Sequence, residues 1–142
     1  MRIYSEFYDA IVEYAQNHAD REVGGVLACD RSGDICLITF EKPNSEKWYQ
    51  YAPDVDFLNK TIEEWPAYFQ FAGLFHSHLN NQSCLSATDR AYITKILSAM
   101  PREISILHFP LCVLPEGRLY GFKAERAEDG SIGITEEPVD VI

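Results

Sequence analysis

Apolar residues recur at helical spacing in three segments of the chain. Intervals of three and four residues place side chains on one face of a helix. The first segment has this spacing at Ile3, Phe7, Ile11, Tyr14 and His18. The second begins at Asp54, ends before Pro66 and has its apolar face at Phe57, Leu58, Thr61, Ile62 and Trp65. The third follows Ser86, ends before Pro101 and has its apolar face at Tyr92, Ile93, Ile96, Leu97 and Met100. We therefore expect three amphipathic helices.

Short apolar runs between and after these helices predict β-strands. Residues 23–29 and 34–40 flank the turn-forming residues 30–33, so we expect an antiparallel hairpin. The mixed residues 41–52 fit neither period and predict a loop or an irregular strand, whereas the aromatic and apolar run 68–75 predicts a buried strand. Later strands are expected at 103–109, 111–114 and 118–124, with a turn at 115–117 between the last two.

The order of these elements predicts the fold class. Three helices interspersed with a hairpin and further strands indicate an α/β sandwich, with a mixed, mainly antiparallel central sheet flanked by helices. With 142 residues, the chain is expected to form one domain, 1–142. The tail from about residue 125 is acidic and weakly patterned. Ile132 and Ile134 could add an edge strand, but Glu136, Glu137 and Pro138 predict a loosely held end.

Composition limits the classes of partner and the cellular compartment that we expect. The formal net charge of −10 disfavours nucleic acid as a partner, because binding to phosphates needs a basic face. Four cysteines occur without a CxxC pair, and no export signal precedes them, so we expect a reduced, cytoplasmic protein. No apolar run approaches the roughly 20 residues that cross a bilayer, so we expect no membrane association.

The string His-x-His-x7-Ser-x-x-Asp carries the candidate chemistry. His76 and His78 stand two apart at the end of the expected strand, so both imidazoles point to the same face and can reach one metal ion. Asp89, in the first turn of the third helix, is the expected third ligand. Two nitrogens and one carboxylate oxygen suit Zn²⁺, and three protein ligands are typical of catalytic zinc. A base is then needed to take a proton from water, and Glu22 is the candidate.

Each of these residues also has a purely structural interpretation. Ser86 and Asp89 have the spacing of a capping box at a helix start, which is compatible with a second role in binding an anion. Glu22 alone would be a solvated strand edge. Its catalytic role is supported only by Gly24 and Gly25, which allow close backbone approach in the strand that follows, and by the metal string. Structural roles are also expected for His18, at a helix C-terminus, and for His108, as a packed or edge histidine. Cys84 is expected to be a free thiol, and Trp48, Tyr49 and Tyr51 to be core residues rather than the lining of a substrate groove.

The string resembles the signature of the JAMM metalloproteases, also called the MPN+ or JAB family. The resemblance covers roughly the first 125 residues and implies a JAB1/MPN-like, cytidine-deaminase-like sandwich in a minimal prokaryotic-type member. It implies that His76, His78 and Asp89 bind Zn²⁺, that Glu22 is the general acid and base, and that Ser86 stabilises the oxyanion. Many members have proline after the second histidine, where this chain has Leu79; the difference bears on loop rigidity more than on metal ligation.

The resemblance implies an activity and a class of partner. We expect a zinc metallopeptidase that cuts peptide or isopeptide bonds after the Gly-rich C-terminus of a ubiquitin-like or sulfur-carrier protein. A non-catalytic MPN-like scaffold and a zinc hydrolase of small amides remain alternatives. Deamination is disfavoured because the His-x-Glu and Pro-Cys-x-x-Cys signature is absent. The sequence does not predict an oligomeric state.

Overall fold

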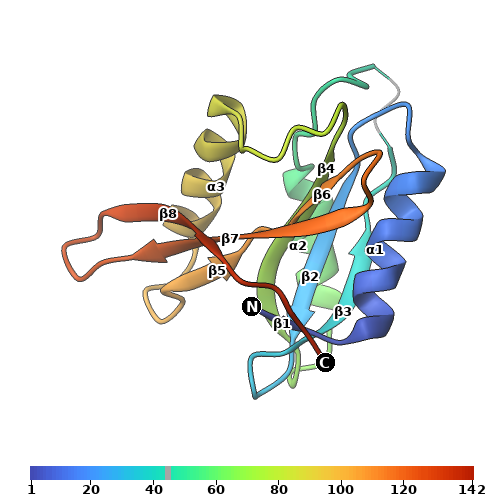
Figure 1. The fold of residues 1–142 in the computed structure, drawn as a ribbon. Coiled ribbons are helices and arrows are strands. Elements are labelled where there is room, and N and C mark those ends of the chain that lie inside the picture. The colour runs from blue at the N-terminus through green and yellow to red at the C-terminus, as the bar shows by residue number, and fades with distance from the viewer. Residues whose placement is uncertain (44–45) are drawn as a thin grey trace.

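The structure is a computed structural model that describes residues 1–43 and 46–142. In these residues, three helices are interspersed with nine strands (Figure 1). The helices are α1 (Ser5–Asn17), α2 (Val55–Glu64) and α3 (Ala87–Ala99). The strands are β1 (Arg2–Ile3), β2 (Gly24–Cys29), β3 (Ile35–Phe40), β4 (Gln70–His78), β5 (Ile106–His108), β6 (Leu111–Val113), β7 (Arg118–Arg126), β8 (Ile132–Glu137) and β9 (Asp140–Val141).

The strands form one mixed sheet with β4 near its centre. The order across the sheet is β5-β7-β6-β4-β2-β3-β1-β9, and β8 pairs with β7. β2 runs antiparallel to both β3 and β4, whereas β4 runs parallel to β5 and β6. β7 pairs antiparallel with β5, β6 and β8. The predicted fold class, a mixed and mainly antiparallel sheet flanked by helices, is confirmed.

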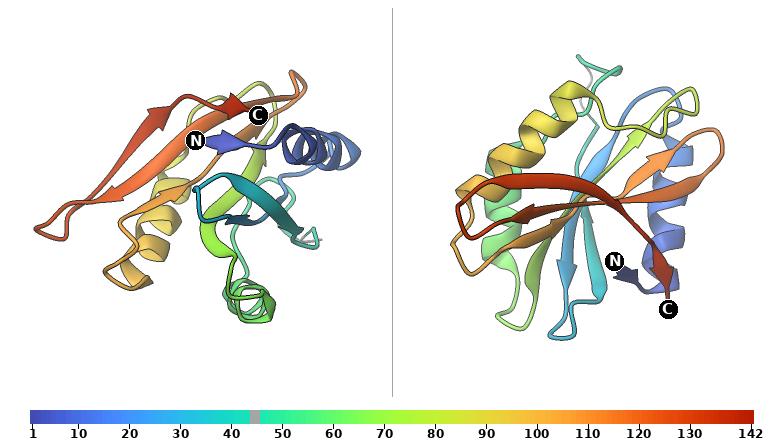
Figure 2. Two further views of the ribbon diagram at one scale, coloured as in Figure 1. Left: turned by 90° about the horizontal axis from the view of Figure 1, so that it is seen from below. Right: turned by 60° about the vertical axis from the view of Figure 1, so that its left-hand side comes forward.

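Helices cover both faces of the sheet, with α1 on one face and α2 and α3 on the other (Figure 2). Alternation along the strands divides the apolar side chains between two cores. In β4, Leu74 packs with α2 and α3, whereas Phe75 packs with α1. From Leu74 onward, the even-numbered positions of β4 therefore face α3, and this sets where the side chains at 76 and 78 point.

The three helices begin and end close to the predicted residues. Asp54 caps α2, because its carboxylate accepts hydrogen bonds from the backbone N–H groups of Asp56 and Phe57. The helix ends at Glu64, shortly before Pro66, as expected. The predicted hairpin of residues 23–29 and 34–40 is confirmed as β2 and β3. None of the described helices is long and apolar enough to span a membrane.

Two predictions about the chain ends are wrong. Ile3 does not begin the first helix; it lies in β1, which pairs with β3 and β9, and the helix begins at Ser5. The segment after residue 125 is not loosely held, because β8 pairs with β7 along its whole length and β9 pairs with β1. Backbone pairing holds these segments, since β8 pairs with the preceding strand β7 and β9 pairs with β1 at the other end of the chain, and the local acidic composition does not reveal such partners.

Candidate metal centre

His76 and His78 lie at the C-terminal end of β4. Both side chains are almost fully buried, with 0% and 3% of their surface exposed, although histidine is often partly exposed in proteins. They point to the face that α3 covers, as their spacing predicts. The strand thus delivers two imidazoles to one place at the end of the sheet.

Asp89 meets the two histidines from the first turn of α3. Ser86 caps this helix: its hydroxyl accepts a hydrogen bond from Asp89 N at 3.0 Å, and Asp89 Oδ2 accepts one from Ser86 N at 2.9 Å. This reciprocal capping box fixes the rotation of the helix start. The structural interpretation of the pair is confirmed, and the same box aims the Asp89 carboxylate at the histidines.

Three ligand atoms converge at this point. His78 Nε2 lies 2.9 Å and His76 Nε2 lies 3.2 Å from Asp89 Oδ2, and the two nitrogens are 3.1 Å apart. Tetrahedral zinc with bonds of about 2.0–2.1 Å separates neighbouring ligands by roughly 3.3 Å. The three atoms therefore have spacings that suit one zinc ion, and His76, His78 and Asp89 are the cluster in the described chain that could hold a metal.

The electrostatics of the three residues also favour a cation. Burial opposes ionisation of Asp89, but hydrogen bonds from His76 and His78 outweigh it and hold the pKa of this carboxyl well below its ordinary value. Burial likewise opposes the charged form of His78, yet its bond to Asp89 and the charge of Glu22 raise its pKa overall. A carboxylate that stays ionised beside two ring nitrogens offers a negative charge to a bound cation.

Each histidine has an outer partner on its second ring nitrogen. His78 Nδ1 lies 3.1 Å from the backbone oxygen of Gln82, and His76 Nδ1 lies 3.0 Å from the hydroxyl of Tyr92. A carbonyl oxygen only accepts, so His78 Nδ1 carries a proton, which leaves Nε2 as the ring atom that can bind a metal ion in place of its hydrogen bond to Asp89. Such outer bonds orient the histidine ligands of metal sites.

Glu22 lies just before β2, where the chain passes the end of β4. Its Oε1 accepts a hydrogen bond from Tyr51 N at 2.9 Å. Burial raises the pKa of Glu22, although the bond from Tyr51 and the positive charge of the histidines oppose the shift. The carboxyl is therefore easier to protonate than an ordinary glutamic acid, which suits a group that takes up and returns a proton.

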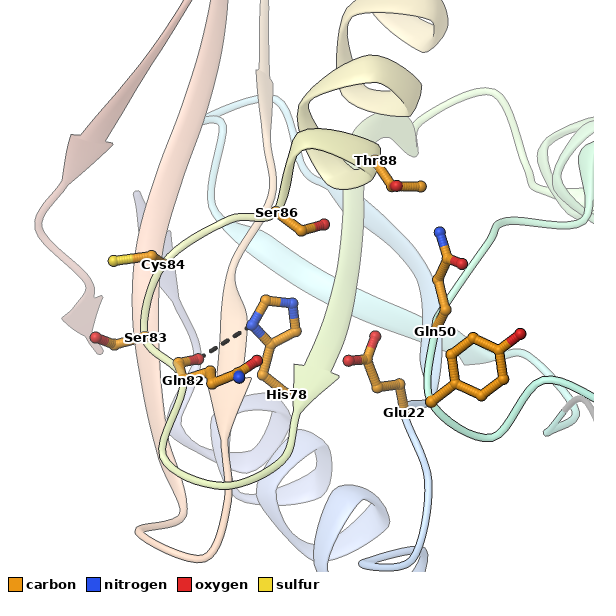
Figure 3. A pocket seen from close by; sticks show the side chains of 9 residues that line it. Glu22, Gln50, His78, Gln82, Ser83, Cys84, Ser86 and Thr88 are labelled. Carbon is orange, nitrogen blue, oxygen red and sulfur yellow. Dashed lines mark hydrogen bonds between the residues drawn. The ribbon is translucent and has the colours of Figure 1, made fainter.

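A cavity of about 510 Å³ opens next to these residues (Figure 3). The Glu22 carboxylate and the His78 ring face each other across it, and the Ser86 hydroxyl points into the same space. The lining residues are Glu22, Tyr49, Gln50, His78, Gln82, Ser83, Cys84, Ser86 and Thr88. The structure thus brings the five residues singled out in the sequence to one end of the sheet.

The other candidates mostly have structural roles. His18 ends α1 and bonds the carbonyl of Tyr14 at 2.8 Å, and His108 pairs with Glu137. Cys84 is an exposed, free cysteine on the cavity wall, and its sulfur points away from His78 (Figure 3).

The aromatic segment before α2 divides into two environments. Tyr51 is a core residue with 5% of its surface exposed, as expected. The same prediction is wrong for Trp48 and Tyr49, which are 53% and 57% exposed and contact each other edge to face. Tyr49 lines the cavity, and neither of the two side chains packs into the core.

Sequence reasoning missed three residues of the site. Ser77, between the histidines, binds the backbone of Val23 through its hydroxyl at 2.9 Å. Gln82 acts through its backbone, so its residue type gave no signal. Tyr92 was counted only as part of the apolar face of α3, but its place three residues after Asp89 puts both on the same side of that helix. That spacing is a signal that could have identified it.

Comparison with known proteins gives a consistent result. A family model described as prokaryotic homologs of the JAB domain matches residues 5–117. The solution structure of protein DSY2949 from Desulfitobacterium hafniense is similar over 99% of this chain and 92% of that one, with a TM-score of 0.71 and 16% identity. The crystal structure of AF2198, a JAB1/MPN domain protein from Archaeoglobus fulgidus, is similar over 100% and 99%, with a TM-score of 0.59 and 14% identity. A search of curated proteins gave no match.

Proposed function

The chain belongs to the prokaryotic homologs of the JAB domain, and from this membership we propose that it is a zinc-dependent metallopeptidase. The proposed reaction is hydrolysis of a peptide or isopeptide bond after the Gly-rich C-terminal tail of a ubiquitin-like or sulfur-carrier protein. One observation carries the proposal: the ligand atoms of His76, His78 and Asp89 converge at a cavity that also contains Glu22 and Ser86.

His76, His78 and Asp89 would hold the zinc ion. When bound in such a site, zinc polarises a carbonyl and lowers the pKa of a water molecule. Glu22 takes the proton of the attacking water and returns it to the leaving amine, a role that its raised pKa favours. The bond from Tyr51 N to Oε1 orients this carboxylate, while Oε2 remains available for the proton.

Ser86 is proposed to stabilise the oxyanion that forms on the attacked carbonyl. Its oxygen already accepts the hydrogen bond from Asp89 N, so the capping interaction uses a lone pair and leaves the hydroxyl proton to be donated. The side chain is exposed to the cavity at the N-terminus of α3, where the helix dipole also favours negative charge. The cap and the oxyanion contact are therefore compatible in a single serine.

The residues on the rim of the cavity indicate where the substrate tail would bind. Tyr49 and Gln50 form its rim before α2, and Trp48 contacts Tyr49 outside it. A flexible tail that ends in glycines can lie close to such a wall, because glycine has no side chain that would clash with it. We propose that the exposed aromatic pair contacts this tail, so Tyr49→Ala should raise KM more than it lowers kcat.

Zinc content and cleavage of Gly-Gly-tailed fusion proteins test the proposal together. Wild type should contain about one zinc per chain, and His78→Ala should contain none. Glu22→Gln should retain zinc but lose about 10²–10⁴-fold in turnover, because it removes only the base. Glu6→Gln, an exposed change in α1, serves as the matched control and should leave turnover unchanged.

Three results would contradict the proposal in different ways. A folded wild type that takes up no zinc would favour a non-catalytic scaffold. Cleavage of small amides without cleavage of any Gly-Gly-tailed fusion would favour a different hydrolase. Wild-type turnover in Glu22→Gln would show that another group acts as the base.

A further inference from the structure

The two histidines of the metal centre have outer partners of different chemistry. His78 Nδ1 faces the carbonyl of Gln82, which can only accept, whereas His76 Nδ1 faces the hydroxyl of Tyr92 at 3.0 Å. A hydroxyl can donate a hydrogen bond or accept one. The proton of His78 is therefore assigned by its neighbour, and that of His76 is not.

The His76 ring cannot adjust by turning, because aromatic rings surround it. Tyr51 stacks on its face with ring centroids 5.7 Å apart and planes 19° apart, and Tyr92 meets it edge to face at 5.9 Å. The side chain has no exposed surface. Nε2 therefore remains the nitrogen that faces Asp89. Only the position of the proton on the ring can change.

The inner nitrogen of His76, Nε2, carries a proton in one state and a free lone pair in the other, depending on whether a metal ion is bound. In the metal-free protein, Nε2 lies 3.2 Å from Asp89 Oδ2 and is well placed to donate a proton to it. To bind a metal, Nε2 must present its lone pair, so the proton must sit on Nδ1. A buried Nδ1–H without an acceptor would cost about 1–3 kcal/mol.

We propose that Tyr92 is a positioning residue that supports both tautomers of His76. Its hydroxyl donates to Nδ1 in the metal-free protein and accepts from Nδ1–H when Nε2 binds the metal. This inference rests on the proposed zinc site, and it adds a fourth side chain that determines zinc affinity. Tyr92 reaches His76 because it lies one turn after Asp89 in α3, so a single helix supplies a ligand to the metal and a partner to another ligand.

Zinc affinity of Tyr92→Phe, measured by competition with a chelator, tests this role. The change keeps the ring and removes only the hydroxyl. The metal-free protein then has an unpaired lone pair on Nδ1, whereas the zinc-bound protein has a buried, unpaired Nδ1–H, which costs more. The affinity should therefore fall about 10–100-fold, as for other outer partners of metal ligands. Tyr14→Phe is the matched control. It removes a hydroxyl that donates to the backbone oxygen of Glu41 at 2.7 Å, and the affinity should stay at the wild-type value.

A spectroscopic measurement tests the proton position without any substitution. In zinc-loaded wild type with ¹⁵N-labelled histidine, NMR should find the proton of the His76 ring on Nδ1, in slow exchange with water. This measurement shows whether Nδ1 carries the proton that the Tyr92 hydroxyl must accept, and it can be made even if Tyr92→Phe does not fold. A zinc-loaded His76 ring without a proton on Nδ1 would overturn the inference.

The outcomes separate this inference from the proposed function. If wild type binds zinc and Tyr92→Phe binds it equally tightly, the inference is wrong while the zinc site stands. If wild type binds no zinc, both are wrong. A merely structural role for Tyr92 would lower the thermal stability of the metal-free protein without changing zinc affinity, and that result also overturns the inference.

Discussion

Ser77 connects the metal strand to the segment that carries Glu22. Its hydroxyl accepts a hydrogen bond from Val23 N at 2.9 Å, and its own N–H donates to Val23 O at 2.8 Å. The Ser77 side chain points away from the two histidines because side chains alternate along a strand. It can therefore hold the backbone of Val23 in place without entering the site. The position of the Glu22 carboxylate thus depends on a residue on the opposite face of the sheet.

Ser77→Ala should lower both stability and turnover. The change leaves the N–H of buried Val23 without this acceptor, which costs about 1–3 kcal/mol of unfolding free energy. The backbone at Glu22 is then less firmly held, so kcat should fall while zinc content stays at the wild-type value. Urea unfolding, zinc analysis and kinetics measure the three quantities. Ser98→Ala, at an exposed position of α3, is the control and should change stability by less than about 0.5 kcal/mol. Unchanged kcat in a destabilised Ser77→Ala would separate Ser77 from the base.

If the proposed site binds zinc, His78 should make the binding depend on pH. Its pKa in the folded, metal-free protein is raised, so protonation stabilises that state below about pH 6.5, and this stabilisation is lost as the pH rises through the raised value. Zinc needs the neutral ring, whereas Asp89 remains ionised throughout this range because its pKa is strongly lowered. Protons and zinc therefore compete at His78.

The increase in Tm that zinc causes should consequently grow with pH. We expect a small increase at about pH 5.5 and a much larger one at about pH 8, since the proton on His78 is displaced more easily at the higher pH. Thermal unfolding with and without zinc measures the effect, and His78→Ala should show no increase at either pH. An equal increase at both pH values in wild type would mean that His78 does not compete for protons.

The residues of the proposed metal site could be singled out from the sequence because their spacing is local. His76 and His78 are two apart on a strand, and Ser86 and Asp89 are three apart at a helix start, so each pair is fixed by its own element. Tyr51 belongs to no such pattern. It reaches the face of His76 across the sheet, and only the three-dimensional structure brings the two together.

At the scale of elements, β2 leaves room for the aromatic ring that packs on the metal site. Gly24 in β2 pairs with His76 in β4, and a Cβ at Gly24 would lie 2.2 Å from a ring carbon of Tyr51. The sequence indicated that Gly24 allows a close approach. The structure identifies what approaches: the Tyr51 ring, which needs this space to stack on the histidine.

Gly24→Ala should therefore weaken both the fold and the metal site. The added methyl group must displace Tyr51 or the backbone at Phe75 O, which lies 2.7 Å from the Cβ position, and such overpacking costs typically about 1–3 kcal/mol. Zinc affinity should also fall, since the ring that restrains His76 moves. Urea unfolding and chelator competition measure these effects. Gly133→Ala in β8 is the control, because no atom lies within 4 Å of its Cβ position. Equal results for the two variants would contradict this account.

Strand limits were predicted less well than helix limits, for a physical reason. α2 and α3 carry their own start and stop signals in Asp54, Ser86 and the prolines that follow them. β5 was expected over 103–109 but covers only Ile106–His108, and β7 extends to Arg126, beyond the expected residue 124. A strand ends where its partner ends, so its limits depend on residues far away in the sequence.

At the scale of the whole molecule, the sheet joins the two ends of the described chain. β1 lies between β3 and β9, and Ile3 O accepts a hydrogen bond from Ile142 N at 2.9 Å. The fold class was predictable from the order of elements, but this pairing was not. It joins residues at opposite ends of the sequence, and the short strands involved have no distinctive pattern of their own.

Removal of residues 132–142 should therefore destabilise the protein, although the sequence alone suggested a loosely held tail. The truncation deletes β8 and β9, leaves the backbone of β7 unpaired along one edge, and removes Ile132 and Ile134, which pack against the core shared with α2 and α3. Full burial of an isoleucine contributes roughly 1.5–3 kcal/mol, so two partly buried ones should account for about 2–4 kcal/mol of unfolding free energy. Because β7 supports β6, which pairs with His76 and His78 in β4, zinc affinity should also decrease. Urea unfolding and chelator competition on the shortened chain measure both effects. A shortened protein with the wild-type midpoint would show that this end of the sheet contributes little to the fold that positions the metal centre.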